Sequence, residues 1–128
     1  MLLKWLDVRL ARVGLTIATI AITTLALIPA PEVPISTGWD KTDHWSAFFT
    51  LSFLLNHSFP KKSLWWVAAV LVAYGIGIEV AQWFTPTRDA DAMDVVADSI
   101  GILGYVVLYF LWLQTARRMG LTARLKSD

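Results

Sequence analysis

The amino-acid sequence predicts an all-α protein, a bundle of four transmembrane helices with its N and C termini in the cytoplasm. Hydrophobic residues make up 56% of the 128 residues, charged residues only 16%, and the mean hydropathy is +0.56. Because about a quarter of the residues in a soluble domain are charged, this surplus of apolar side chains indicates that lipid is the solvent. The apolar residues gather in four runs, at 13–28, 45–59, 64–84 and 95–113.

The lengths of these runs decide where the helices are expected to begin. A helix needs about 20 residues to cross roughly 30 Å of hydrocarbon, and the runs 64–84 and 95–113 meet that requirement. The run 45–59 is shorter, so its helix is expected to begin earlier, near residues 40–44. This places the polar residues of that segment at the membrane boundary.

The first apolar run follows a short basic segment, residues 1–12. Such a segment also fits a secretory signal peptide, but the small-residue pattern of a cleavage site is missing. An uncleaved first helix is therefore expected, and residues 1–128 are expected to form one integral membrane domain. The chain has no cysteine, which excludes disulfide bonds and thiolate metal sites.

The basic residues predict the orientation in the membrane, because lysine and arginine favour the cytoplasmic side. With four spans and both termini inside, nine of the eleven basic residues fall on the inner side, and only Lys41 and Arg88 fall outside. All acidic residues except Asp7 and Asp128 then lie in outer loops or outer helix ends. The net charge of +1 gives no general attraction to nucleic acid, and none is expected as a partner.

Polar residues from distant parts of the sequence meet at the outer end of this predicted bundle. Each of them would be costly facing lipid, at about 2.5–3.5 kcal/mol for a charge at mid-membrane, so they should turn inward and share a pocket. The expected site residues are Asp40, Lys41, His44, Glu79, Gln82, Arg88, Asp91, Asp94 and Asp98.

These residues belong to motifs with a fixed order and spacing. The motifs are Asp40-Lys41-x-x-His44, Phe48-Phe49, Glu79-x-x-Gln82-x-Phe84, Pro86-x-Arg88 and Asp91-x-x-Asp94-x-x-Ala97-x-x-x-Gly101, between about residues 40 and 104. This pattern resembles that of the VanZ-like membrane proteins. The chain departs from it at Asp98, where the family usually has Asn, and at Thr87, where it usually has Gly.

The resemblance implies a family and a location. The VanZ-like family is named for a protein associated with teicoplanin resistance, a form of glycopeptide antibiotic resistance, in Gram-positive bacteria. It therefore implies a multi-pass protein of the bacterial inner (cytoplasmic) membrane that is related to the cell envelope. It implies no particular reaction.

One function that fits the site is binding of an anionic lipid head group or a lipid-linked cell-envelope component. Lys41 and Arg88 would hold a phosphate or carboxylate, Arg88 through its planar fork and Lys41 as a point charge. The remaining polar residues would bond sugar or peptide groups. The lipid bilayer is then the main partner, and no cofactor is expected. The sequence does not decide whether the protein forms a homo-oligomer.

An alternative function is a small membrane enzyme. His44 would act as general acid or base, with Glu79 or Asp94 orienting it or sharing a proton. In one variant, His44, Glu79, Asp91 and Asp94 would hold a divalent metal ion. No nucleophile motif and no HExxH motif supports these readings, so no metal ligand is assigned.

Two further interpretations need no bound ligand. Glu79 could carry protons across the membrane, although four helices leave little room for a pathway without an oligomer. In the other, the polar residues form a structural network that holds the helices in register. Asp94 would cap the fourth helix, Arg88 would bridge Glu79 and Asp91, and His44 would bond a backbone carbonyl.

Overall fold

The computed structural model describes residues 2–29 and 40–120, with side chains for residues 7–29 and 41–120. This part of the chain forms four helices and no strand, which confirms the all-α prediction. The helices are α1 (Leu2–Leu27), α2 (Asp40–Ser58), α3 (Leu64–Trp83) and α4 (Ala92–Arg118). Each helix covers one of the predicted apolar runs, and α2 begins at Asp40, as its short run required.

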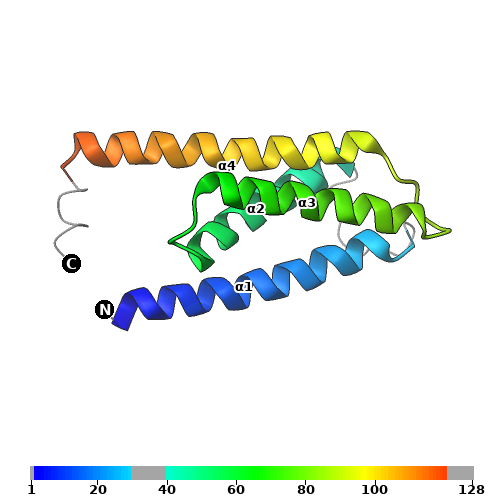
Figure 1. The fold of residues 1–128 in the computed structure, drawn as a ribbon, viewed down its shortest axis with the longest axis horizontal. Coiled ribbons are helices and arrows are strands. Elements are labelled where there is room, and N and C mark those ends of the chain that lie inside the picture. Colours follow the sequence, from blue (N-terminus) through cyan, green and yellow to red (C-terminus); the bar gives the residue numbers. More distant parts are fainter. Residues whose placement is uncertain (1, 30–39, 121–128) are drawn as a thin grey trace.

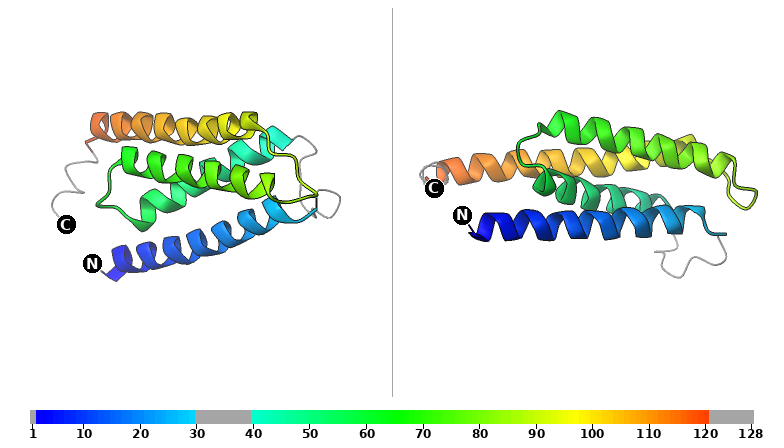
Figure 2. Two further views of the ribbon diagram at one scale, coloured as in Figure 1. Left: turned by 45° about the vertical axis from the view of Figure 1, so that its right-hand side comes forward. Right: turned by 60° about the horizontal axis from the view of Figure 1, so that its bottom comes forward.

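Helices that follow one another in sequence run in opposite directions along the bundle (Figures 1 and 2). α1 and α3 run one way, and α2 and α4 return. α2 packs against all three other helices, whereas α1 and α4 are not neighbours. As a result, α1 begins and α4 ends at one end of the bundle, and the polar motifs lie at the opposite end.

Apolar side chains of the central helix α2 form the middle of the core. The buried core residues are Phe48, Leu51 and Leu55 of α2, Val67, Leu71 and Ile78 of α3, and Ile102 of α4. The α2 residues follow one another at spacings of three and four, so they share one face of the helix. Ser52 is buried beside them and donates to the Phe48 carbonyl oxygen at 2.7 Å, which satisfies its hydroxyl.

Two glycines allow α4 to lie close to α2 and α3. A Cβ atom at Gly101 would collide with the carbonyl oxygen of Trp45 and would lie 3.0 Å from the backbone nitrogen of Phe49. A Cβ atom at Gly75 would lie 2.6 Å from Oδ2 of Asp98. Small residues at helix interfaces permit such close approach of two backbones. These contacts bring the acidic face of α4 against both neighbouring helices.

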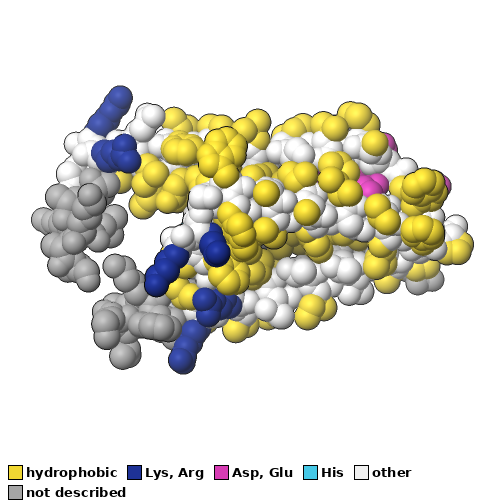
Figure 3. Space-filling model, viewed as in Figure 1, with side chains coloured by type: hydrophobic (Ala, Val, Ile, Leu, Met, Phe, Trp, Pro, Cys, Tyr) yellow, Lys and Arg dark blue, Asp and Glu magenta, His cyan; other side chains and the backbone are white. Residues whose placement is uncertain are grey.

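Apolar side chains cover much of the face seen in Figure 3, between the charged groups at its two ends. By length and composition, the segments Asp7–Leu27, Leu64–Trp83 and Ala92–Arg118 are suited to cross a membrane. α2 is not one of these segments. It is the most polar of the four helices, and its apolar residues Phe48, Leu51 and Leu55 are buried in the core.

Most of the described lysines and arginines lie at one end of the molecule, and most of the aspartates and glutamates lie at the other (Figure 3). We call the end with Arg9, Arg12, Lys61, Lys62, Arg117 and Arg118 the basic end. We call the end with Glu79, Asp89, Asp91, Asp94 and Asp98 the acidic end. α2 and α4 begin at the acidic end, where α1 and α3 finish.

Candidate functional site

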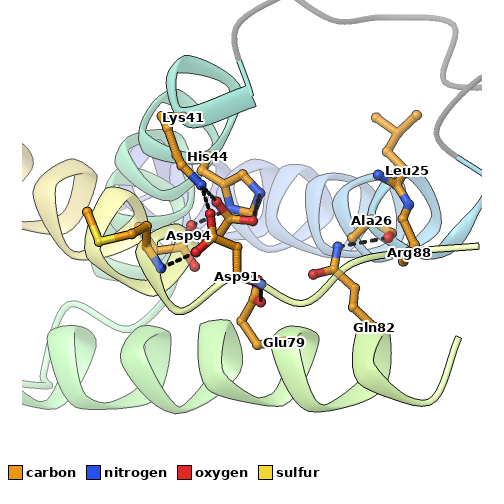
Figure 4. A network of polar contacts seen from close by, with 11 residues as sticks. Leu25, Ala26, Lys41, His44, Glu79, Gln82, Arg88, Asp91 and Asp94 are labelled. Atoms are coloured by element: carbon orange, nitrogen blue, oxygen red, sulfur yellow. Dashed lines mark hydrogen bonds and ion pairs between the residues drawn. The ribbon is translucent and has the colours of Figure 1, made fainter.

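Lys41 joins α2 to the beginning of α4 at the acidic end (Figure 4). Its ammonium group lies 2.6 Å from Oδ2 of Asp91 and also donates to Oδ1 of Asp94. The two acceptors differ in their surroundings, because Asp91 is exposed and Asp94 is buried. The single cation therefore compensates one buried carboxylate and one at the surface.

Asp91 is the N-cap of α4. Its backbone is extended, and its carboxylate accepts a hydrogen bond from the backbone N–H of Met93 at 2.9 Å. The expectation that Asp94 caps this helix is wrong: Asp94 lies within the first turn, and its carboxylate faces Lys41. The hydrogen bond from Lys41, followed by that from Met93, lowers the pKa of Asp91.

His44 lies one helical turn after Lys41 and between two buried carboxylates of α4. Its Nδ1 is 2.9 Å from Oδ1 of Asp98, and its Nε2 is 3.4 Å from Oδ2 of Asp94. The contacts seen at its ring nitrogens are therefore with carboxylates, instead of the backbone carbonyl predicted for a structural network. A cationic imidazole can donate to both acids, whereas a neutral one can donate to only one.

Glu79 and Gln82 are buried on the same stripe of α3, with 9% and 4% of their surface exposed. Oε2 of Glu79 accepts a hydrogen bond from the backbone N–H of Asp91 at 2.9 Å. Nε2 of Gln82 donates to the carbonyl oxygen of Ala26 at 3.0 Å. Each side chain thus links α3 to the backbone of another segment through one of its two polar atoms.

Arg88 turns toward α1 and away from Lys41 and Asp94 (Figure 4). Its Nε donates to the Ile28 carbonyl oxygen at 2.7 Å, and its Nη2 donates to the Leu25 carbonyl oxygen. The predicted bridge from Arg88 to the acids of α3 and α4 is therefore wrong. The last carbonyls of a helix have no partner within it, and a cation is favourable at that end.

A hollow of about 400 Å³ lies beside Arg88, lined by Trp83, Arg88, Asp89 and Ala90. It is formed by the end of α3 and the segment that leads to α4. The sequence indicated Arg88 as a site residue but did not identify Trp83 and Asp89 as its neighbours. The only indication in the sequence was that both residues lie within five positions of Arg88.

The VanZ/LLP1 family model matches residues 13–113 of the sequence. The chain belongs to the VanZ/LLP1 family. The match covers parts of all four helices and is therefore wider than the motif region between about residues 40 and 104. No curated protein and no solved structure matches the chain.

The site of this VanZ/LLP1 family protein has two parts. Lys41, His44, Asp91, Asp94 and Asp98 form a network between α2 and α4, made of the Lys41 ion pairs and the contacts of the His44 ring, to which Glu79 is joined through Asp91. Arg88 and Gln82 instead bond the last turn of α1 and the residue after it. The side chain of Asp40, which was also predicted to belong to the site, lies outside the described residues.

The arrangement of the VanZ/LLP1 protein limits the chemistry that the site can perform. Both ring nitrogens of His44 face carboxylates, so neither is presented to a substrate as an acid or base. Among the side chains described, those of residues 7–29 and 41–120, no three of His, Asp or Glu are placed to hold a metal ion. The described side chains offer charge and hydrogen bonds for contact with a ligand.

Proposed function

We propose that this protein crosses the bacterial inner membrane four times and binds an anionic head group at its outward-facing acidic end. The head group belongs to a lipid or to a lipid-linked cell-envelope component. The observation that carries the proposal is the placement of Arg88. The carbonyl oxygens of α1 fix its guanidinium group at the wall of a hollow of about 400 Å³.

The direction of the helices supports four crossings. α1 and α3 run the same way, so the chain must return between them, and α2 is the segment that does so (Figures 1 and 2). If α1 and α3 span the bilayer, α2 spans it too, with its polar side chains covered by neighbouring helices. The basic end, where α1 begins and α4 ends, then lies in the cytoplasm by the positive-inside rule.

Arg88 is suited to an anionic head group because its remaining Nη1 group makes no hydrogen bond to any described residue. A guanidinium group recognises phosphate and carboxylate through paired N–H donors. Trp83 stands at the same wall with 79% of its surface exposed, and such aromatic side chains favour the head-group region of a membrane. Lys41 is not proposed as a second anion ligand, because Asp91 and Asp94 hold its ammonium group.

The proposed class of ligand rests on the location of the hollow and on the resemblance to the VanZ-like proteins. An outward-facing hollow at head-group depth meets phospholipids and lipid-linked precursors of the cell envelope. The association of the namesake protein with teicoplanin resistance fits a ligand of the second kind. We therefore include envelope precursors in the proposal.

A purely structural network is the second candidate. The favouring observation is that Lys41 and His44 each lie between two carboxylates, so the charges of α2 and α4 compensate one another without a ligand. This candidate explains the ion pairs, but it gives no role to the hollow beside Arg88.

Mass spectrometry of lipids bound to the purified protein tests the proposal. Arg88→Ala should lower the amount of bound anionic lipid at least about tenfold, since a hydrogen bond to a charged group contributes about 1.5–3 kcal/mol. The matched control is Arg117→Ala at the basic end, which should retain the lipid. Equal lipid in the wild type and Arg88→Ala would contradict the proposal and favour the structural network.

Arg88→Ala also removes the bonds to α1, so a second variant is needed. Asp89→Asn leaves Arg88 in place and removes a negative charge from the lining of the hollow. It should increase the affinity for an anionic head group severalfold, because like charges repel. A lower or unchanged affinity would mean that the hollow does not hold an anion.

A further inference from the structure

Two buried acceptor atoms at the acidic end lack a hydrogen-bond donor among the described residues. They are Oε1 of Glu79 and Oε1 of Gln82. More than nine-tenths of each residue is buried. Buried polar atoms are nearly always hydrogen-bonded, so two unpartnered acceptors on one helix require an explanation.

The orientation of both side chains is fixed by their other polar atoms. Nε2 of Gln82 donates to the Ala26 carbonyl, and because a carbonyl can only accept, the amide cannot be turned over. Oε2 of Glu79 is held by the backbone N–H of Asp91. The two residues are three apart in α3 and share one face. Figure 4 shows the amide oxygen of Gln82 turned to the side of Glu79 and Asp91, so both unpartnered acceptors lie on the face of α3 toward the segment that leads to α4.

The charges around these two acceptors favour a positively charged donor. Four carboxylates lie in this part of the molecule, those of Glu79, Asp91, Asp94 and Asp98. The Lys41 ammonium bonds Asp91 and Asp94. His44 lies between Asp94 and Asp98. No described cation contacts Glu79. A cationic N–H donor would bond a carboxylate more strongly than a neutral donor would.

We infer that Oε1 of Glu79 and Oε1 of Gln82 accept hydrogen bonds from a primary ammonium group of the ligand. This site is the amine-binding half of the head-group site proposed above, whose phosphate-binding half is Arg88, and the inference rests on that proposed function. Arg88 and Asp91, whose N–H holds Glu79, are three residues apart and thus at most about 11 Å apart along the chain. The ligand class is a phosphate joined by a short linker to a primary amine, as in phosphoethanolamine.

Lipids that differ only in the head group test this inference on the purified full-length protein in a nonionic detergent. The probes are short-chain phosphatidylethanolamine, phosphatidylcholine, whose methylated nitrogen has no N–H donor, and phosphatidylglycerol, which has no amine. Phosphatidylethanolamine should bind at least about tenfold tighter than the other two, the factor expected for a charge-assisted hydrogen bond. Equal binding of all three would overturn the inference without requiring any variant.

The decisive variant is Glu79→Gln. Its new amide can still accept from the Asp91 N–H and can donate to Oε1 of Gln82, so the melting temperature without lipid should not fall. The preference for phosphatidylethanolamine should fall to less than about twofold, because the negative charge is gone. Retention of the full preference would overturn the inference. The matched control is Asp7→Asn, an exposed acid on α1 near the basic end, which should change neither quantity.

The same experiment separates failure of this inference from failure of the proposed function. If Arg88→Ala abolishes binding of all three lipids but the wild type does not discriminate among them, only the amine site is wrong. If Arg88→Ala has no effect on any lipid, the proposed function fails and the inference fails with it. Soluble phosphoethanolamine is added as a competitor of the lipid. It shows whether the site binds the free head group as well as the head group of a lipid.

Discussion

Asp91 is the residue through which three helices meet at the acidic end. Its carboxylate bonds Lys41 of α2 and caps α4 at Met93, and its backbone N–H bonds Glu79 of α3. Its exposed position keeps it in contact with water, so its ionisation follows the pH of the medium. Protonation of its carboxylate therefore weakens the bond to Lys41 of α2 and the cap of α4.

The lowered pKa of Asp91 predicts a contribution to stability that depends on pH. Because the folded chain binds this proton less readily than the unfolded chain, the contribution is present above the ordinary aspartate pKa of about 3.9. It is lost as the pH falls below that value and through the lower folded pKa. Thermal unfolding in detergent should show a smaller decrease over this range for Asp91→Asn than for the wild type.

Asn is a suitable replacement in this test because its side chain also caps helices well. The comparison therefore removes the ion pair with Lys41 and keeps an acceptor for Met93. Asp94 also bonds Lys41 and is present in both proteins, so its contribution cancels to first order. Parallel curves of melting temperature against pH for the two proteins would show that the ion pair between Lys41 and Asp91 does not contribute to stability.

At the residue scale, the sequence allowed prediction of contacts between side chains but not of contacts with the backbone. Lys41, His44, Asp94 and Asp98 were expected together because each would be costly in lipid at the same depth, and the structure brings them together. Arg88 was expected to join them and does not. Its acceptors are main-chain carbonyls of α1, which no pattern of side chains reveals.

At the scale of the helices, the interface between α2 and α4 depends on the absence of a side chain at Gly101. Gly101→Ala should lower the free energy of unfolding by about 1–3 kcal/mol, since overpacking an interface displaces the backbone. The matched control is Gly77→Ala, where a Cβ atom meets nothing within 4 Å. This control should be neutral or slightly stabilising, because glycine weakens a helix interior. Thermal unfolding of the two variants measures the difference.

A second prediction at this scale concerns the end of α1. Removing Arg88 leaves the carbonyl oxygens of Leu25 and Ile28 without their donor. In Arg88→Ala, hydrogen exchange in the last turn of α1 should therefore accelerate, while exchange in the middle of α2 should stay unchanged. Arg88→Lys should give an intermediate rate because lysine retains the charge but not the fork. Unchanged exchange in the last turn would show that Arg88 does not hold α1.

Helix positions were more predictable than helix ends. The run 95–113 marked the fourth helix, but α4 extends from Ala92 to Arg118. Apolar runs report where side chains meet lipid, whereas a helix continues as long as its backbone hydrogen bonds are made and a cap is present. The N-cap at Asp91 could not be distinguished from Asp94 because both are acids within one turn of the helix start.

At the scale of the whole molecule, the separation of charge between the two ends predicts the orientation in the membrane. The chain has no cysteine, so single cysteines can be introduced and labelled without a background. In intact cells, an impermeant maleimide should label Asp89→Cys and should label Lys62→Cys only after the membrane is opened. Labelling of both positions from the same side would contradict the proposed topology.

The order of the helices could be predicted from the apolar runs, but the central place of α2 could not. The shortness of its run and the polar residues at its start predicted only that the helix begins at the membrane boundary, near residues 40–44. Its position in the middle of the bundle comes from contacts made by Phe48, Leu51 and Leu55, which depend on the other helices. Contacts between residues that are distant in sequence cannot be inferred from the composition of one segment.

α1 and the residue after it contribute only main-chain oxygens, those of Leu25, Ala26 and Ile28, to the bonds made by Arg88 and Gln82. Main-chain oxygens are the same for every amino acid, so these bonds do not depend on which residues stand there. They depend on where α1 stops, because one inserted or deleted residue shifts the end by about 1.5 Å and rotates it by about 100°. The last turn of α1 should therefore tolerate amino-acid substitutions, whereas an insertion or deletion within α1 should break the bonds to Arg88 and Gln82.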